Sequence, residues 1–162
     1  FELRRGARGK RRDRRLEESR GYTPLVNSLF IPRASFTIHI PNTGQTGHLF
    51  VILTDTCAEG FNLLVPVCSI RPNKRHDDTC LLGVGDHSFI RHPSYVAYHH
   101  LEKKDAPDLI KKVKSGTIDY KGIMADHIFH RVCAGVEMSD DAAPIYQAYF
   151  KAQVSVMRAR MA

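Results

Sequence analysis

Long apolar runs are missing from this chain of 162 residues, and the longest, such as residues 61–67, cover only a handful of positions. A membrane-spanning helix needs about twenty apolar residues, so the sequence excludes one. Residues 1–20 also lack the apolar core of a secretory signal. With 43% hydrophobic and 25% charged residues, the composition is that of a soluble globular protein and not of a disordered or collagen-like chain.

Cysteine is scarce and widely spaced. Cys57, Cys68, Cys80 and Cys133 form no Cys-x-x-Cys pair, which argues against a zinc ribbon and against a thioredoxin-type redox motif. Because the chain shows no secretory signal, we interpret the four as reduced thiols of a cytoplasmic protein, each buried as a small hydrophobic residue. A domain of this size needs neither disulfides nor a metal in order to fold.

Established catalytic motifs are missing as well. The chain has no Walker loop, no Gly-x-Ser-x-Gly, no His-Glu-x-x-His and no His-x-Glu with a Pro-Cys-x-x-Cys. The short segment at residues 83–86 contains too few glycines for a dinucleotide fingerprint, and no βαβ order surrounds it. Function must therefore be inferred from clusters of side chains.

Excess positive charge is confined to one end. The formal net charge is +7, but residues 1–33 hold ten Lys and Arg against four acids, so the rest of the chain carries only +1. We expect residues 1–33 to be a disordered or non-native N-terminal extension. A basic arm for nucleic acid is an alternative, and a transit peptide is disfavoured by the acids. Residues 34–162 are expected to form a single domain.

The remaining sequence predicts strands first and helices afterwards. Pro66 predicts a bulge or a strand end, and Asp126 is the expected N-cap of a helix. The pattern indicates an α+β fold: a small curled antiparallel β-sheet or an SH3-like barrel with C-terminal helices. The predicted strands cover residues 35–40, 48–54, 61–69, 80–84 and 95–99, with a short extended piece at 119–121, a turn-rich loop at 41–47, and helices at 106–115, 127–138 and 142–156.

Histidine, serine and tyrosine are unusually dense over residues 86–100. Histidine suits proton transfer near neutral pH. Cleavage of RNA by transesterification needs a base for the 2′-hydroxyl proton, an acid for the leaving oxygen and a cation for the phosphorane. His48, Arg71 and His92 could fill these roles without a metal or any other cofactor.

Other interpretations of these residues remain open. Any one of the histidines can be an ordinary polar residue. His99 and His100 would point to opposite faces of a strand, so they could not bind one metal ion together with Asp105. His127 and His130 have a spacing that allows ligation on a helix, although a solvated surface is favoured. Cys68 could act as a nucleophile beside His48, but burial is the preferred interpretation. We therefore expect no metal site.

One further pattern lies in the order of the features. The loop NTGQTG leads into the apolar strand HLFVILT, and a second apolar strand, LLVPVCS, ends in a small hydroxyl residue. The extended segment CLLGVGD, the strand SYV and a C-terminal helix follow. This order resembles the MazF/PemK/Kid-like family of small toxin proteins over roughly residues 35–140. The resemblance implies an SH3-like barrel, a homodimer, a cognate antitoxin and metal-independent cleavage of single-stranded RNA.

The resemblance also suggests site residues. The family carries Arg-Pro at the start of the central strand and Thr at the end of the next, where this chain has His48-Leu49 and Cys68-Ser69. It implies His48 as the acid, Ser69 as a donor to phosphate and Arg71 as the missing cation. The remaining residues expected to line the RNA groove are Cys68, His87, Arg91, His92, Ser94 and Tyr95.

Two other functional classes stay open. The missing Arg and Thr, with the low net charge of residues 34–162, favour a non-catalytic barrel that binds a protein or nucleic acid and so regulates or inhibits a cellular target. The chain could also be a soluble α+β protein with no toxin role.

Overall fold

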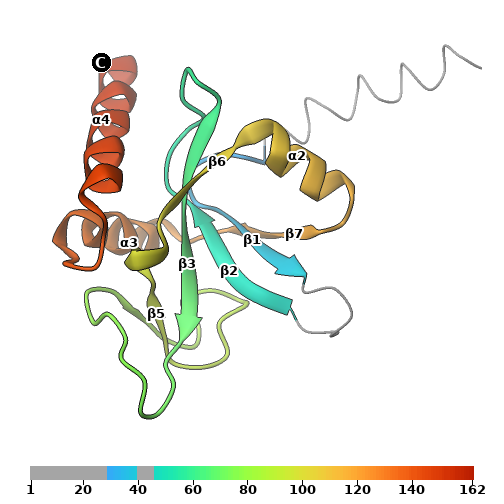
Figure 1. Cartoon of the computed structure of the whole chain (residues 1–162), viewed down its shortest axis with the longest axis vertical. Helices are drawn as coiled ribbons and strands as arrows, with labels where there is room; N and C mark the ends of the chain where they lie inside the picture. The colour runs from blue at the N-terminus through green and yellow to red at the C-terminus, as the bar shows by residue number, and fades with distance from the viewer. Residues whose placement is uncertain (1–28, 40–45) are drawn as a thin grey trace, which may run out of the picture.

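The structure is a computed structural model of the chain, and it describes residues 29–39 and 46–162. The predicted extension up to residue 28, and all but the end of the predicted loop at 41–47, lie outside the described residues. The described part is α+β, as predicted, with an antiparallel sheet followed mostly by helices (Figure 1). The strands are β1 (Ala34–His39), β2 (Thr46–Ile52), β3 (Phe61–Ser69), β4 (Leu81–Leu82), β5 (Ser94–Val96), β6 (Glu102–Asp105) and β7 (Ile118–Ile123).

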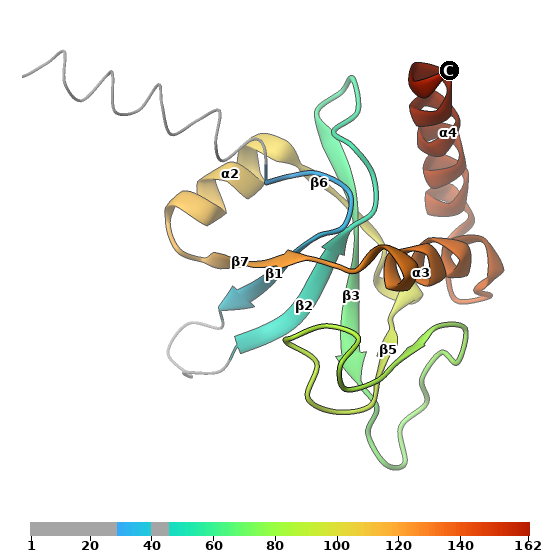
Figure 2. The ribbon, with the colours of Figure 1, turned by 180° about the vertical axis from the view of Figure 1, so that it is seen from behind.

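The helices complete the chain order. They are the 3₁₀ turn η1 (Tyr98–His100) and the α-helices α2 (Ala106–Lys114), α3 (Asp126–Met138) and α4 (Pro144–Met161). Figure 2, seen from behind, shows α4 running beside the sheet, roughly parallel to β3. None of the helices among the described residues has the length and apolar content needed to cross a lipid bilayer.

The sheet is open. Its strands follow the order β4-β5-β3-β2-β1-β7, and β6 pairs with β3 beside this path. Strand β3 is the centre, because β2 pairs with one of its sides while β6 and then β5 pair with the other. Of the two predicted forms, the curled antiparallel sheet is present, and the closed barrel is not formed in the described residues.

Pro66 lies inside β3, where the sequence predicts a bulge or a strand end. The strand continues through it, and Pro66 pairs with Phe50 in an unbroken register. Its carbonyl accepts a hydrogen bond of 2.9 Å from the N–H of Ala97. A residue's N–H and C=O point to the same side of an antiparallel strand. The missing N–H of proline therefore faces Ala97, just beyond the end of β5, and not β2, so the β2–β3 ladder loses no hydrogen bond.

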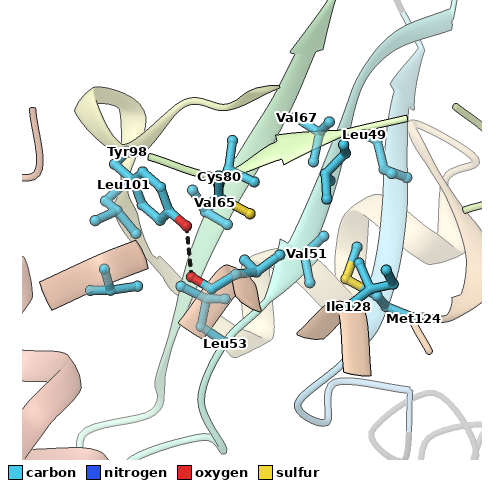
Figure 3. Packing of buried hydrophobic residues seen from close by; sticks show 14 of the residues in the cluster. Leu49, Val51, Leu53, Val65, Val67, Cys80, Tyr98, Leu101, Met124 and Ile128 are labelled. Carbon is cyan, nitrogen blue, oxygen red and sulfur yellow. Dashed lines mark hydrogen bonds between the residues drawn. The ribbon is translucent and has the colours of Figure 1, made fainter. Parts of the chain in front are cut away.

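The sheet is covered on both faces, which explains the continuous apolar runs of β2 and β3. Leu49 and Val51 of β2 point into the larger cluster, which includes Val132 of α3 and is shown in Figure 3. The alternate residue Ile52 points to the other face, into the smaller cluster with Leu109 of α2. Helices on opposite sides of one sheet thus bury both sets of side chains.

The packed domain begins earlier than the sequence predicts. The predicted start is residue 34, but residues before it are already part of the core. Phe30 is only 4% exposed and stacks on Phe36 with ring centroids 5.4 Å apart. Arg33 donates hydrogen bonds from its backbone N–H to the carbonyl of Ile52 and from Nε to the carbonyl of Met124, both at 2.9 Å. Residues just before 34 therefore belong to the fold, although their mixed composition has no helical or strand period.

Several element ends also differ. The predicted strand at 95–99 stops at Val96, the strand at 80–84 shortens to two residues, and the last helix begins at Pro144 and ends at Met161. Asp126 lies in the first turn of α3, and the N-cap is Ala125. Strand β6 was not predicted, because its sequence, Glu-Lys-Lys-Asp, has no apolar residue to indicate it.

Thr37 provides a test of the packing of β1. Its buried hydroxyl has no hydrogen-bond partner, so we expect Thr37→Val to raise the free energy of unfolding by about 1 kcal/mol. Thr54 is the matched control, because its buried hydroxyl accepts a 3.1 Å hydrogen bond from the N–H of Leu63. Thr54→Val is expected to lower the same quantity by about 1–2 kcal/mol. Urea denaturation measures both changes, and a destabilised Thr37→Val would contradict this account.

Candidate functional site

One end of the sheet, where β2 begins and β3 ends, gathers most of the predicted site residues. The two strands are antiparallel, and Leu49 pairs with Val67. One step further along this register, His48 lies opposite Cys68. The loop of residues 70–80 leaves from the same end of β3, at the bottom of the sheet in Figure 1.

Strand β5 adds two more predicted residues to this end. Tyr95 pairs with Cys68, and Ser94 pairs with Ser69. Cys68 is half-buried, whereas Ser69 is exposed. Residues far apart in the sequence therefore meet because β3 is paired on both of its sides.

A hollow of about 290 Å³ lies over this end of the sheet, and we call it the end groove. It contains all three predicted catalytic residues. Three of its lining residues are Lys or Arg, and no Asp or Glu lines it among the described residues, so its charge favours an anionic ligand. The lining is His48, Cys68, Ser69, Arg71, Lys74, Arg75, His76 and Tyr95.

The loop that carries these cations is fastened at Asp77. The buried Asp77 carboxylate accepts hydrogen bonds from the hydroxyl of Ser139 and from the N–H of Thr79. Burial opposes ionisation, but these hydrogen bonds hold the pKa of Asp77 below its ordinary value. Arg75 forms an ion pair of 2.8 Å with Asp141. Arg71 and Lys74 have no carboxylate partner among the described residues, so these two cations are better placed than Arg75 to meet a ligand.

A second hollow, of about 460 Å³, adjoins the end groove, and we call it the loop-side hollow. It shares His48, Ser69 and Arg71 with the end groove. It also brings in Arg91 and His92 from the loop before β5, which supply a further cation and a second imidazole. The remaining lining residues are Gly47, Leu49, Val67, Phe89, Ile90 and Ser94.

A third hollow, of about 420 Å³, adjoins the end groove, and we call it the helix-side hollow. It shares His48 and Cys68 with the end groove, so His48 lines all three. Its other residues come from β2, β3, η1, β6 and α4, and from position 101 between η1 and β6. They are Phe50, Pro66, His99, His100, Leu101, Glu102 and Tyr146.

His87 was expected to line the RNA groove, but the structure buries it elsewhere. It is only 7% exposed, and it lines none of the three hollows. Its Nδ1 accepts a hydrogen bond of 3.0 Å from the N–H of Phe89, which leaves Nε2 to donate to Ser35 Oγ at 2.9 Å. The Ser35 hydroxyl donates in turn to the carbonyl of Gly122 at 2.7 Å. His87 thus ties the loop that carries Arg91 to β1 and β7.

This arrangement predicts a pH-dependent stability. Burial lowers the pKa of His87, so below pH ~6.5 the unfolded chain binds a proton that the native chain does not. Between pH 7.5 and 5.5 we expect this histidine to remove up to about 1.4 kcal/mol from the free energy of unfolding. Denaturation at both pH values should show a smaller decline for His87→Gln than for the wild type. The exposed His92, changed to Gln, is the control; equal declines for His87→Gln and the wild type would contradict the assignment.

The cysteines are all free thiols. Cys80 is buried, as expected, whereas the other three are half-buried. Burial raises the pKa of Cys68, against the smaller opposing effects of Tyr95 and Arg71. A thiol with a raised pKa is a poor nucleophile at neutral pH, so the geometry does not favour a thiolate mechanism.

His99 and His100 are closer together than expected. They belong to the 3₁₀ turn η1, and their ring centroids lie 3.9 Å apart. The prediction that they point to opposite faces was wrong, because it assumed a strand. Among the described residues, no group of three histidine, cysteine or acidic side chains is arranged to hold a metal ion.

Several lining residues were not predicted. The basic run of Lys74, Arg75 and His76 lies in the loop after β3, and it was a signal that could have been used. His76 contacts Asp78 through Nε2 at 2.8 Å, while its buried Nδ1 has no hydrogen-bond partner. Tyr146 comes from α4, and no local pattern indicates that it reaches the sheet.

The chain was also compared with known proteins. No protein-family model matches it, and no curated protein matches it either.

Proposed function

We propose that the protein is a metal-independent endoribonuclease that cleaves single-stranded RNA where the end groove and the loop-side hollow meet, at His48, Ser69 and Arg71. One observation carries this proposal: His48, Ser69 and Arg71 line a single hollow with two more cations and, among the residues that the structure describes, no carboxylate. A phosphodiester is the anionic group that such a hollow would attract, and imidazole is suited to the proton transfers that its cleavage needs.

The proposed reaction is a transesterification. The 2′-oxygen attacks the adjacent phosphorus as His92 removes its proton, and the bond from phosphorus to the 5′-oxygen breaks as His48 protonates that oxygen. The products are a 2′,3′-cyclic phosphate and a free 5′-hydroxyl. Arg71 stabilises the charge on the phosphorane, and Ser69 donates a hydrogen bond to a phosphate oxygen. All four side chains line the loop-side hollow.

The neighbouring residues support binding of a strand. Arg91 and Ser94 extend the loop-side hollow, and Lys74 and Tyr95 extend the end groove. Residues 34–162 carry a net charge of only +1, so RNA affinity depends on this local group of cations. Cation–phosphate contacts make binding sensitive to salt.

The test is incubation of the purified chain with a long RNA of mixed sequence in EDTA. We expect fragments that end in 2′,3′-cyclic phosphate. RNA that stays intact at high protein concentration would refute the nuclease. RNA that is bound but not cut would instead favour the second candidate, a non-catalytic module that regulates or inhibits its target by binding.

The resemblance to MazF/PemK/Kid-like proteins supports a wider proposal. In it, the protein is the toxin of a toxin–antitoxin pair, acts in the cytoplasm as a homodimer, and is inhibited by a cognate antitoxin protein. Induced expression of the chain is expected to arrest bacterial growth, and expression of His48→Gln is not. Normal growth with abundant wild-type protein would contradict the toxin.

A further inference from the structure

We infer that the helix-side hollow binds a nucleobase of the RNA strand whose phosphate lies in the end groove. This inference rests on the proposed function and assigns a substrate subsite to it. The two hollows are contiguous, because His48 and Cys68 line both of them. A strand held by its phosphate beside His48 therefore has an adjoining base within reach of the helix-side hollow.

The lining of this hollow differs in kind from that of the end groove. Within the described part of the chain, the end groove has three Lys or Arg residues and no carboxylate. The helix-side hollow has no Lys or Arg among its described lining residues, and it has one carboxylate, Glu102. Glu102 pairs with Lys104 at 3.0 Å. A phosphate is thus favoured in the first hollow and disfavoured in the second.

Rings and flat apolar surfaces make up much of the helix-side hollow. Phe50 and Pro66 lie opposite each other on β2 and β3, and Tyr146 approaches from α4. Bases of single-stranded RNA bind by stacking on such side chains, since every base has a π-face. The carboxylate of Glu102 can accept a hydrogen bond from the exocyclic amino group of a base.

His99 and His100 add two more rings to the helix-side hollow. Both side chains are exposed, and their ring centroids are 3.9 Å apart. Burial lowers the pKa of His99, and the nearby His100 adds to this effect. A neutral imidazole at pH 7 presents a ring for stacking without adding a cation for phosphate, which fits a base better than a backbone.

The test compares two probes with the full chain. One is a hexanucleotide of 2′-O-methyl RNA, which cannot be cleaved because its 2′-oxygens are blocked. The other is the same backbone with every base removed. We expect the double variant His99→Ala/His100→Ala to bind the base-containing probe about tenfold more weakly than the wild type. Its affinity for the abasic probe should stay within about twofold, because stacking makes no contribution there. Fluorescence anisotropy measures both affinities.

The matched control is His127→Ala/His130→Ala, which removes a second exposed histidine pair from α3. It should leave both affinities unchanged. Unchanged affinity of His99→Ala/His100→Ala for the base-containing probe would overturn the inference. An equal loss on both probes, or wild-type protein that binds neither, would overturn it as well. A base-dependent loss in a protein that cuts no RNA would support the base site and refute the nuclease, so the two failures are distinguishable.

Discussion

His48→Gln is expected to slow cleavage of single-stranded RNA by about 10²–10⁴-fold, the usual contribution of general acid catalysis. His48 lines all three hollows at the end of the sheet, so it is the side chain that a bound strand meets in any of them. Glutamine keeps a similar length and can still form hydrogen bonds, but it cannot transfer a proton. Single-turnover rates with saturating enzyme measure the chemical step directly.

Two comparisons separate catalysis from binding in this experiment. The affinity of His48→Gln for the uncleavable hexanucleotide should remain within about twofold of the wild type, because the cations remain in place. His127→Gln, an exposed histidine on α3, is the control and should cleave at the wild-type rate. A His48→Gln variant that cleaves as fast as the wild type would remove His48 from the reaction.

Gly135→Ala is expected to lower the free energy of unfolding by about 3 kcal/mol or more, at the upper end of the usual effect of overpacking. A Cβ at residue 135 would overlap the ring and hydroxyl of Tyr98. Tyr98 is 0% exposed, and its hydroxyl donates a hydrogen bond of 2.8 Å to the carbonyl of Val132 in α3 (Figure 3). The ring therefore has no room to move away.

The sign of this effect makes it a strong test. In a helix without such a contact, Gly→Ala stabilises by about 1 kcal/mol. The exposed neighbour Ala134 is the control, and Ala134→Gly should destabilise by about 1 kcal/mol for that reason alone. Adding Tyr98→Leu to Gly135→Ala should give a smaller loss than the two single changes combined, because leucine vacates the space that Cβ needs. Urea denaturation measures all four variants, and a Gly135→Ala as stable as the wild type would refute the contact.

Some elements could be predicted from the sequence because local pattern and tertiary environment agree there. The run at 61–69 is mostly apolar, and it forms β3 with those bounds because both faces are covered. Helix α2 begins at Ala106, as the position of Pro107 suggests. Strand β6 and the packing of Phe30 could not be predicted, since pairing with β3 and contact with Phe36 create them.

In the candidate site, too, some features could be predicted from the sequence and others depend on tertiary contacts. That His48, Ser69 and Arg71 share a hollow follows from the antiparallel register of β2 and β3, once the two strands are known to pair. His87 could not be separated from His92 by sequence, because both lie in one polar loop. Only the contact of that loop with Ser35 buries one of them and leaves the other exposed.

The sequence by itself determined the α+β class, the main strands and helices, and the confinement of excess charge to the first 33 residues. These depend on composition and on periodicity within short segments. Only the tertiary structure decided that the sheet stays open, that Tyr146 of α4 reaches the same hollow as His48, and that His99 and His100 lie side by side. Such contacts join residues far apart in the chain or depend on a turn that its neighbours impose, so they arise from strand pairing and packing.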